Sequence, residues 1–321
     1  LTLDIYSTVL EYTTKGTISL VSIDDCTFST DELYSQKAVV VGTNKAPITS
    51  GDIDLEIKNS SSVTAYDLSR TPYLDENNFF ANGIPVTIKS DGSSGVVIEW
   101  AEQIIDGKEI SAGSKTISDS SKLIVFGGAN AASVESSNIT MNGGEVYALV
   151  GGGYFELNKD NNTGKHTIPN NAEPAKVSSS TIIVNGGTAN SVFGGGMGYT
   201  VVETANVTIN DCTKILCVAG GGFNGNITIW NDSDKKYNNN EYGINSSFPT
   251  SNNDISKAFY NVTNDTTVTI NNGTVVYALG GGRLGYTYVD NATLITKGGT
   301  FDEIIAGGMN GYTGTANLTV N

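Results

Sequence analysis

Acidic and apolar side chains alternate in one stretch near the start of the chain, which carries Asp52, Asp54 and Glu56. Side chains two residues apart lie on the same face of a strand, so we expect these three carboxylates in a row on an outer face. Such a row could bind Ca²⁺ through carboxylate oxygens or supply two catalytic carboxylates. A solvated strand face gives the same pattern, so Ca²⁺ is a candidate ligand and no cofactor is required.

Tyrosines that follow a glycine recur at Tyr199, Tyr286 and Tyr312. If these tyrosines are aligned on successive repeats, their rings stack on one another and the role is structural. If the rings are exposed in a row, they form a platform for sugar rings or peptide, because aromatic faces suit such ligands. The sequence leaves both alternatives open.

Histidine and cysteine are too sparse for a catalytic or metal site. His166 is the only histidine and lies in a polar stretch, whereas a metal site or a catalytic triad needs further ligands or partners. The three cysteines, Cys26, Cys212 and Cys217, lack the spacing of a zinc site. We interpret Cys212 and Cys217 as small apolar fillers, with a disulfide between them as the alternative. The sequence therefore predicts no catalytic residue and no enzyme.

The charge balance narrows the classes of partner. Against 33 Asp and Glu the chain has 18 Lys and Arg, which gives a formal net charge of −15. A field of that sign repels phosphate backbones and anionic lipid surfaces, so we expect neither nucleic-acid binding nor direct membrane insertion. Acidity of this kind keeps a secreted protein soluble.

Composition and repeats define the elements that must position these residues. With 38 glycines, 6 prolines and abundant Thr, Val, Ile, Asn and Ser, the chain is predicted to be all-β and rich in turns. One repeated mark is a short strand that ends in Asn or Lys and small residues, as in Ile139–Gly144, Ile183–Gly187, Val207–Asp211, Val268–Gly273 and Leu294–Gly299. A second mark, an apolar residue before two or three glycines, follows at Val150–Gly153, Phe193–Gly196, Ala219–Gly222, Leu279–Gly282 and Ala306–Gly308.

The spacing of the first mark predicts the architecture. Asn185 and Asn210 are 25 residues apart, and Asn271 and Lys297 are 26 residues apart. A repeat of this length with short strands and glycine turns fits one coil of a parallel β-helix, whereas leucine-rich repeats and propeller blades have other signatures. Glycine allows sharp turns, and Asn above Asn can exchange side-chain hydrogen bonds. We therefore predict a right-handed parallel β-helix of roughly ten coils.

One domain is predicted for residues 1–321. Residues 1–120 are expected to form irregular N-terminal coils, and residues 121–321 regular glycine-rich coils. Two spacings exceed the repeat, so long loop insertions are expected near residues 154–178 and 229–263. Insertions in a solenoid commonly lie on one side, often its binding side.

The repeated units between about Val125 and Asn321 resemble the pectate-lyase-like right-handed β-helix superfamily, particularly glycine-rich surface and adhesin-like proteins of bacteria. Enzymes of that superfamily use clustered Asp ligands with Arg or Lys, or several Asp with a nearby His. The outer faces here carry mainly Thr, Asn and Gly, and this departure indicates a protein without catalysis. The resemblance thus implies an extracellular or cell-surface segment.

The expected function is that of a non-catalytic structural or adhesin-like segment, with glycans or proteins of a host or a neighbouring cell as partners. The alternatives are a polysaccharide-binding or polysaccharide-degrading β-helix of lyase, hydrolase or phage tailspike type, and a self-assembling surface fibre subunit. Ala316–Asn321 repeats Ala205–Asn210, which opens a coil, so we expect a segment cut from a longer polypeptide. Open coil ends also predict self-association.

Overall fold

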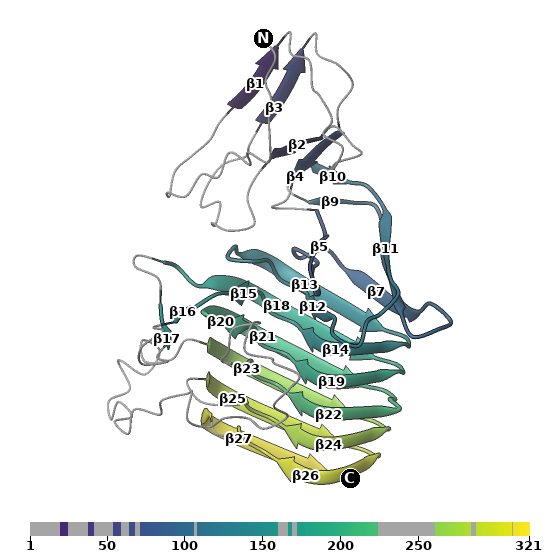
Figure 1. Ribbon diagram of the computed structural model, residues 1–321. Coiled ribbons are helices and arrows are strands. Elements are labelled where there is room, and N and C mark those ends of the chain that lie inside the picture. Colours follow the sequence, from purple (N-terminus) through teal and green to yellow (C-terminus); the bar gives the residue numbers. More distant parts are fainter. Residues whose placement is uncertain are drawn as a thin grey trace.

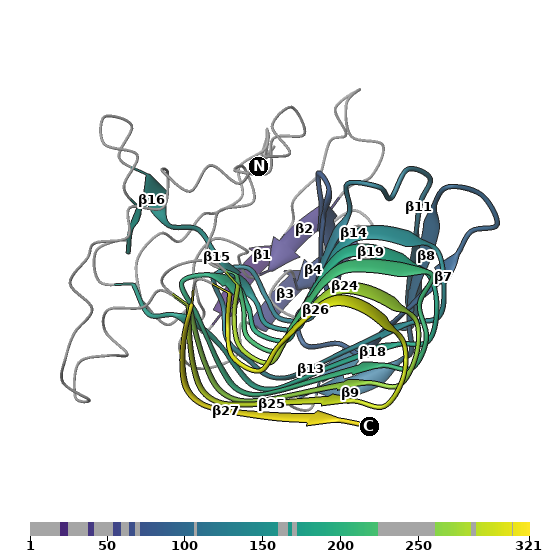
Figure 2. The ribbon, with the colours of Figure 1, turned by 90° about the horizontal axis from the view of Figure 1, so that it is seen from below.

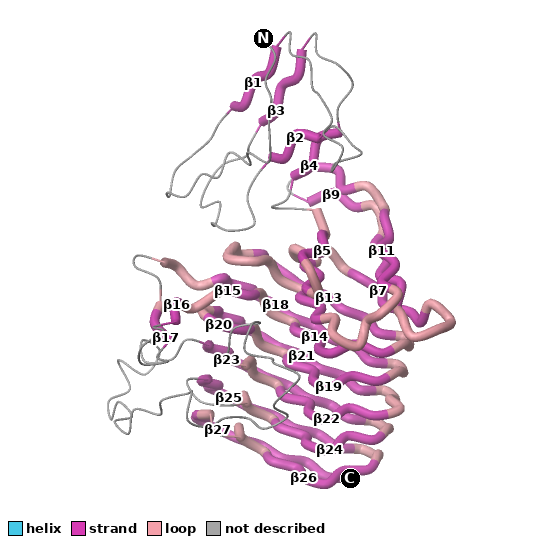
Figure 3. The backbone as a smooth tube through the Cα atoms, viewed as in Figure 1, coloured by secondary structure: helices cyan, strands magenta, loops and turns pink. Residues whose placement is uncertain are grey.

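The computed structural model contains strands and no helix among the residues that it describes (Figure 3). The all-β prediction is thereby confirmed for this part of the chain, and no helix there could span a membrane. The described residues are 71–105, 108–159, 166–168, 172–223, 261–283, 287–309 and 311–321, together with strands at 20–24, 38–41, 54–58 and 64–67.

Two large sheets contain most of the strands (Figure 1). In spatial order the nine-stranded sheet is β11 (Gly113–Ile117), β8 (Val96–Trp100), β7 (Val86–Ser90), β13 (Val134–Met141), β18 (Ala175–Val184), β21 (Thr200–Ile209), β23 (Asn261–Ile270), β25 (Thr287–Thr296) and β27 (Tyr312–Val320). The eight-stranded sheet is β26 (Thr300–Ile305), β24 (Thr274–Leu279), β22 (Lys214–Ala219), β19 (Thr188–Phe193), β14 (Glu145–Val150), β12 (Ile124–Phe126), β6 (Asn78–Phe80) and β5 (Tyr73–Asp75).

Short strands form the remaining two-stranded sheets. The parallel pairs are β1 (Leu20–Asp24) with β3 (Asp54–Lys58), β2 (Ala38–Val41) with β4 (Thr64–Asp67), and β15 (Tyr154–Phe155) with β20 (Met197–Gly198). The antiparallel pairs are β9 (Gln103–Ile105) with β10 (Lys108–Ile110), and β16 (Asn158–Lys159) with β17 (His166–Thr167).

From β13 onwards the chain alternates between the two large sheets. Each strand pairs in parallel with the strand one repeat away, so that Val207 of β21 lies between Ile182 of β18 and Val268 of β23. Seen along the stack, successive repeats follow nearly the same path (Figure 2). Equivalent residues of the repeat therefore form columns, spaced by the distance of about 4.8 Å between neighbouring strands.

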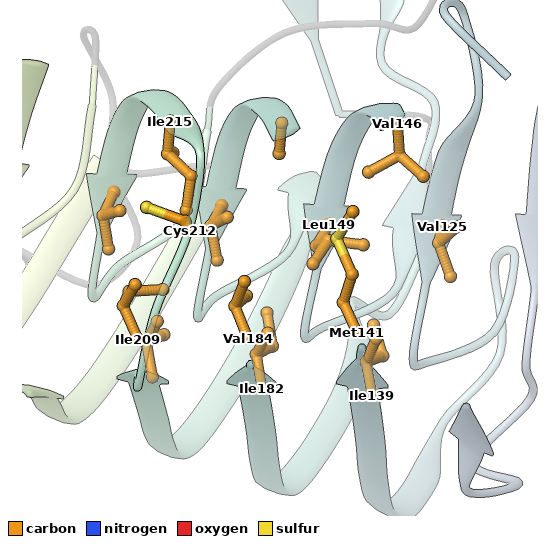
Figure 4. Packing of buried hydrophobic residues seen from close by; sticks show 14 of the residues in the cluster. Val125, Ile139, Met141, Val146, Leu149, Ile182, Val184, Ile209, Cys212 and Ile215 are labelled. Atoms are coloured by element: carbon orange, nitrogen blue, oxygen red, sulfur yellow. The ribbon is translucent and has the colours of Figure 1, made fainter. Parts of the chain in front are cut away.

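The main core lies between the two large sheets. Ile182 and Val184 of β18 point toward the layer that contains Val146 and Leu149 of β14 (Figure 4), and all four side chains are at most 1% exposed. The period of two in the strand sequence produces this arrangement, since alternate residues face inward. Each such side chain contributes about 1.5–3 kcal/mol by its burial.

The eight-stranded sheet is also buried on its other face. Val192 of β19 belongs to the main core, whereas the next residue, Phe193, belongs to a second apolar cluster. Phe193 stacks on Phe223 with ring centroids 5.6 Å apart, and Phe80 stacks on Phe126 at 4.9 Å. Burial on both faces is typical of parallel sheets. This second cluster was not predicted from the sequence.

Glycines that follow strands of the eight-stranded sheet contact side chains of the nine-stranded sheet. The Ser180 hydroxyl donates a hydrogen bond to the Gly194 carbonyl at 2.8 Å, and the Thr266 hydroxyl donates one to the Gly280 carbonyl at 2.7 Å. A Cβ added at Gly194 would lie 3.0 Å from the Cβ of Ala205. The triple glycines therefore serve mainly to bring backbones together.

An asparagine ladder forms at the end of the regular strands, as the repeat predicts. Asn185 donates a side-chain hydrogen bond to Asn142, Asn210 to Asn185, and Asn271 to Asn210, each at 2.8 Å. Asn185 and Asn210 thus each join the repeat before them to the repeat after them. Such ladders add directional contacts to those of the backbone.

The strands just before the regular repeats are partly antiparallel. β7 pairs in parallel with β13, but β8 and β11 continue the sheet in antiparallel fashion, and β5 is antiparallel to β6. The turn after β7 accounts for the reversal. Asp91 accepts hydrogen bonds from the N–H groups of Ser93 at 2.7 Å and Gly95 at 3.0 Å, and Gly92 has a φ of 86°. Glycine at positive φ is typical of a hairpin turn.

The two predicted insertions interrupt neither large sheet. The first falls between β15 and β18, where it includes the short pair β16–β17, and the second falls between β22 and β23, mostly outside the described residues. β18 still pairs with β13, and β23 still pairs with β21. The strand register is therefore kept across both.

Candidate ligand-binding face

The outward face of the nine-stranded sheet carries two regular columns of polar and β-branched side chains. Both columns are half-buried along most of their length, because each side chain packs against its neighbours above and below. One column is Asn138, Thr181, Asn206, Thr267, Thr293 and Asn317, and the other is Thr140, Ile183, Thr208, Thr269, Ile295 and Thr319. We call this surface the polar face. Its hydroxyl and amide groups can donate and accept hydrogen bonds at fixed intervals.

Two tyrosines stack near the beginning of the last two strands of this sheet. Tyr288 of β25 and Tyr312 of β27 are paired in register, and their ring centroids lie 5.3 Å apart with an interplanar angle of 12°. Val262 precedes them in the same column. Because the rings stack along the column, the facing sides of the two rings are occupied by each other. Those sides are closed to a ligand, whereas Tyr312 is still 38% exposed, so a role of its ring in binding stays a prediction.

A carboxylate fixes the Tyr288 side chain. The Tyr288 hydroxyl donates a hydrogen bond to Asp290 at 3.0 Å, and the neighbouring Asp265 accepts one from Asn291 at 2.9 Å. Burial, followed by the hydrogen bond to Asp290 and its charge, raises the pKa of Tyr288 to about 12. A phenolate beside a carboxylate is disfavoured, so Tyr288 stays a neutral donor across the physiological range.

We predict that Tyr288 ionises well after an ordinary tyrosine, whose pKa is 10.0. Because the folded-state pKa is raised, the stabilisation is complete below pH 10 and is lost as the pH rises toward about 12. Because burial also raises the pKa of Tyr199, the titration uses Tyr199→Phe as the background. The tyrosinate ultraviolet absorbance should then show a late step that Tyr288→Phe removes and that Asp290→Ala shifts to lower pH. Tyr277→Phe is the control and should leave the late step in place. A late step that persists in Tyr288→Phe would contradict the assignment.

The three tyrosines singled out by sequence do not form one ladder across the described residues. Tyr199 contacts Phe155 edge-on at 5.9 Å, whereas Tyr312 stacks on Tyr288. Tyr286 lies outside the described residues. The column that holds Tyr312 passes through Val201 rather than Tyr199. The expected alignment of Tyr199 with Tyr312 is therefore wrong.

The cause is the variable connection between the glycines and the next strand. Isolated parallel bridges join Met197, Arg283 and Met309 to their neighbours in one column after the glycines. In each repeat a different number of residues separates this bridge from the column of Tyr288 and Tyr312. Val201 comes four residues after Met197, Tyr288 five after Arg283, and Tyr312 three after Met309. Counting from the glycine thus misplaces the tyrosines. Counting back six residues from Leu294 and from Leu318 would have found the stacked pair.

The predicted acidic row lies partly within the described residues. Asp54 and Glu56 occupy alternate positions of β3, paired with Leu20 and Ser22, while Asp52 falls outside the described residues. The backbone of His166 pairs with that of Lys159. In the described part of the chain, no three His, Cys, Asp or Glu side chains gather so as to hold a metal ion. Ca²⁺ binding stays a prediction.

Cys212 and Cys217 are free thiols on opposite faces of the eight-stranded sheet. Cys212 packs in the main core and Cys217 in the second cluster. The prediction of small apolar fillers is confirmed, and the alternative disulfide between them is not formed. Burial raises the pKa of both thiols, although the Arg283 guanidinium offsets part of the rise at Cys217. Both are therefore protonated near neutral pH.

We predict that neither thiol reacts with Ellman's reagent while the chain is folded, because the thiolate is the nucleophile and both groups are buried. The measurement uses Cys26→Ser, so that only Cys212 and Cys217 are counted, and both should react once urea unfolds the chain without reductant. Thr274→Cys, at an exposed position of β24, is the control and should react at once. Failure of either thiol to appear after unfolding would contradict the free-thiol assignment.

No family model, curated protein or solved structure matches this chain. The described residues therefore define the class of the protein by themselves: they are all-β, with two large sheets of mostly parallel strands. Within that class, its particular features are the asparagine ladder, the glycine contacts and the polar face.

Proposed function

We propose that the chain is a right-handed parallel β-helix of roughly ten coils, related to the pectate-lyase-like superfamily. The alternation of successive strands between two parallel sheets supports a solenoid. The right hand follows from the general handedness of parallel crossovers, which are right-handed in about 98% of cases. β7 and the six parallel strands beyond it correspond to seven coils, and the pairs β1–β3 and β2–β4 support two more.

The chain acts, in this proposal, as a non-catalytic structural and adhesin-like segment of an extracellular surface protein. The observation that carries the proposal is the polar face, whose columns keep one register across six strands. A surface of this kind presents many weak donors and acceptors at once, which suits extended glycan or protein partners. The net charge of −15 argues against nucleic acid as the partner.

Binding of the purified chain to arrayed glycans and to intact cells tests this function. Thr208→Arg combined with Thr269→Arg places two large charged side chains on the polar face and should weaken binding by about tenfold or more. Thr274→Arg, on the eight-stranded sheet, is the matched control and should bind like the wild type. If the wild type does not bind, or if the wild type and both variants bind equally, the polar face is not the binding surface.

A polysaccharide-binding or polysaccharide-degrading β-helix is the second candidate, favoured by the neighbouring carboxylates Asp265 and Asp290. Both accept hydrogen bonds from neighbouring side chains, which suits a positioning role better than proton transfer. Incubation with acidic polysaccharides, with and without Ca²⁺, should release no new reducing ends. Release that Asp290→Asn abolishes would establish the enzyme instead. Fibres of the intact chain in electron micrographs would favour a self-assembling surface subunit.

A further inference from the structure

The two columns of the polar face have an unusual composition for a surface. Their twelve positions are seven threonines, three asparagines and two isoleucines. A soluble surface carries about 25–35% charged residues, so about three or four of twelve positions would ordinarily be charged. None of these twelve is charged, although the chain has 18 Lys and Arg and 33 Asp and Glu. The face therefore suits a ligand that carries no charge.

The side chains of these columns are also stiff. The threonines and isoleucines are β-branched, and β-branched side chains have few χ1 rotamers. Each is confined further by its neighbours in the column, as Thr208 lies between Ile183 and Thr269, and all three are half-buried. Each threonine thus holds a methyl and a hydroxyl group in place. Little conformational entropy is lost when such a surface meets a rigid partner.

The polar face is flat. At the usual twist of about 20–25° between neighbouring strands, its six strands would fan out by about 100° in total. Successive repeats instead follow nearly the same path when they are seen along the stack (Figure 2). The asparagine ladder runs along one side of the face, with equal hydrogen bonds of 2.8 Å from Asn185 to Asn142 and from Asn210 to Asn185. Side-chain ladders of this kind stabilise untwisted sheets.

Flatness gives the face two regular spacings. Neighbouring strands lie about 4.8 Å apart, and the two columns, which are two residues apart along each strand, lie about 6.8 Å apart. Both spacings are close to repeats of the oxygen lattice in hexagonal ice. Water molecules held between the methyl and hydroxyl groups can therefore join such a lattice.

We propose that the polar face binds ice, so that crystal growth stops where the chain is adsorbed. A crystalline polysaccharide is the other solid with a regular array of hydroxyl groups. Sugar rings, however, pack well on aromatic faces, and none of the twelve positions is aromatic. The inference concerns the same surface as the proposed function, but it requires neither a glycan nor a protein partner.

Microscopy of single ice crystals in a solution of the purified 321-residue chain tests the proposal, together with the gap between the freezing and melting temperatures. The wild type should shape growing crystals into facets and hold freezing below melting. Thr208→Arg combined with Thr269→Arg places two charges in the middle of the face and should abolish both effects. The matched control is Thr274→Arg combined with Thr300→Arg, which places two charges at exposed neighbouring positions of the eight-stranded sheet. It should act like the wild type.

Urea unfolding separates loss of the surface from loss of the fold, because the doubly substituted face variant should unfold like the wild type. If it does not fold, Thr293→Arg makes a single change in the other column and should narrow the freezing gap. A wild type that leaves ice crystals unshaped overturns the proposal, as does a folded face variant that shapes them fully. Binding to arrayed glycans or to microcrystalline cellulose without ice shaping would overturn this inference and support the proposed function. Ice shaping without glycan or cell binding would do the reverse.

Discussion

Gly220→Ala is expected to lower the free energy of unfolding by about 3 kcal/mol, the upper part of the range for overpacking a close-packed interior. A Cβ at this position would lie 2.7 Å from the Cβ of Thr266 and would also meet the carbonyl oxygen of Gly280. Both neighbours belong to the junction between the two large sheets, and the Thr266 hydroxyl is bonded to that same carbonyl. Neither can move without breaking a contact in the adjoining repeat.

Urea unfolding followed by circular dichroism measures this loss, and the chain supplies a close control. At Gly186 the nearest atom to an added Cβ is the Asn142 carbonyl oxygen, at the ordinary distance of 3.4 Å. Gly186→Ala should therefore change stability by no more than about 0.5 kcal/mol. Equal stabilities for Gly220→Ala and Gly186→Ala would show that the sheets approach less closely at Gly220 than the contacts imply.

The alternation of apolar and polar residues made the strands of the nine-stranded sheet predictable from the sequence. Val268 and Ile270 are fully buried, whereas Thr269 between them is half-buried, as a sheet with one core face requires. The asparagine ladder followed from the same repeat, because equal spacing places equal residues above one another. Both features depend only on local sequence and a constant period.

The second cluster could not be predicted in this way. In β19 the run Ser191-Val192-Phe193 is buried throughout, so it carries no alternation from which two faces could be distinguished. Its outer face is buried because the chain returns past it after the glycines, where Phe223 packs on Phe193. Only the three-dimensional path of the chain supplies that contact.

The stacked tyrosines and Asp290 were harder still to predict. Which residues come together there depends on the strand register and not on the residue type. Tyr288 and Asp290 show no repeated motif, and connections of unequal length after the glycines shift Tyr312 away from the column of Tyr199. Burial of the strand core fixes the register, because a slip of one residue would expose every inward side chain. Tyrosines in the connection itself have no such constraint.

Phe193→Ala is expected to destabilise the chain by about 3–5 kcal/mol, the range for deleting a buried phenylalanine. Phe193 is fully buried and stacks on Phe223, and its neighbours in the same column are the smaller Val150 and Ala219. These neighbours are held by strand pairs on both sides, so they cannot move to fill the space. Chemical unfolding of the wild type and the variant gives the difference directly.

Tyr288→Ala provides the comparison that decides what the second cluster contributes. It also removes one ring of a stacked pair, but from the outer face, where Tyr288 is only half-buried, so a loss of about 1 kcal/mol is expected. If the second cluster is a true core, the two variants must differ by about 2 kcal/mol or more, because only Phe193→Ala leaves a cavity. Equal losses would mean that the outer face of the eight-stranded sheet packs loosely and that the main core alone holds the repeats together.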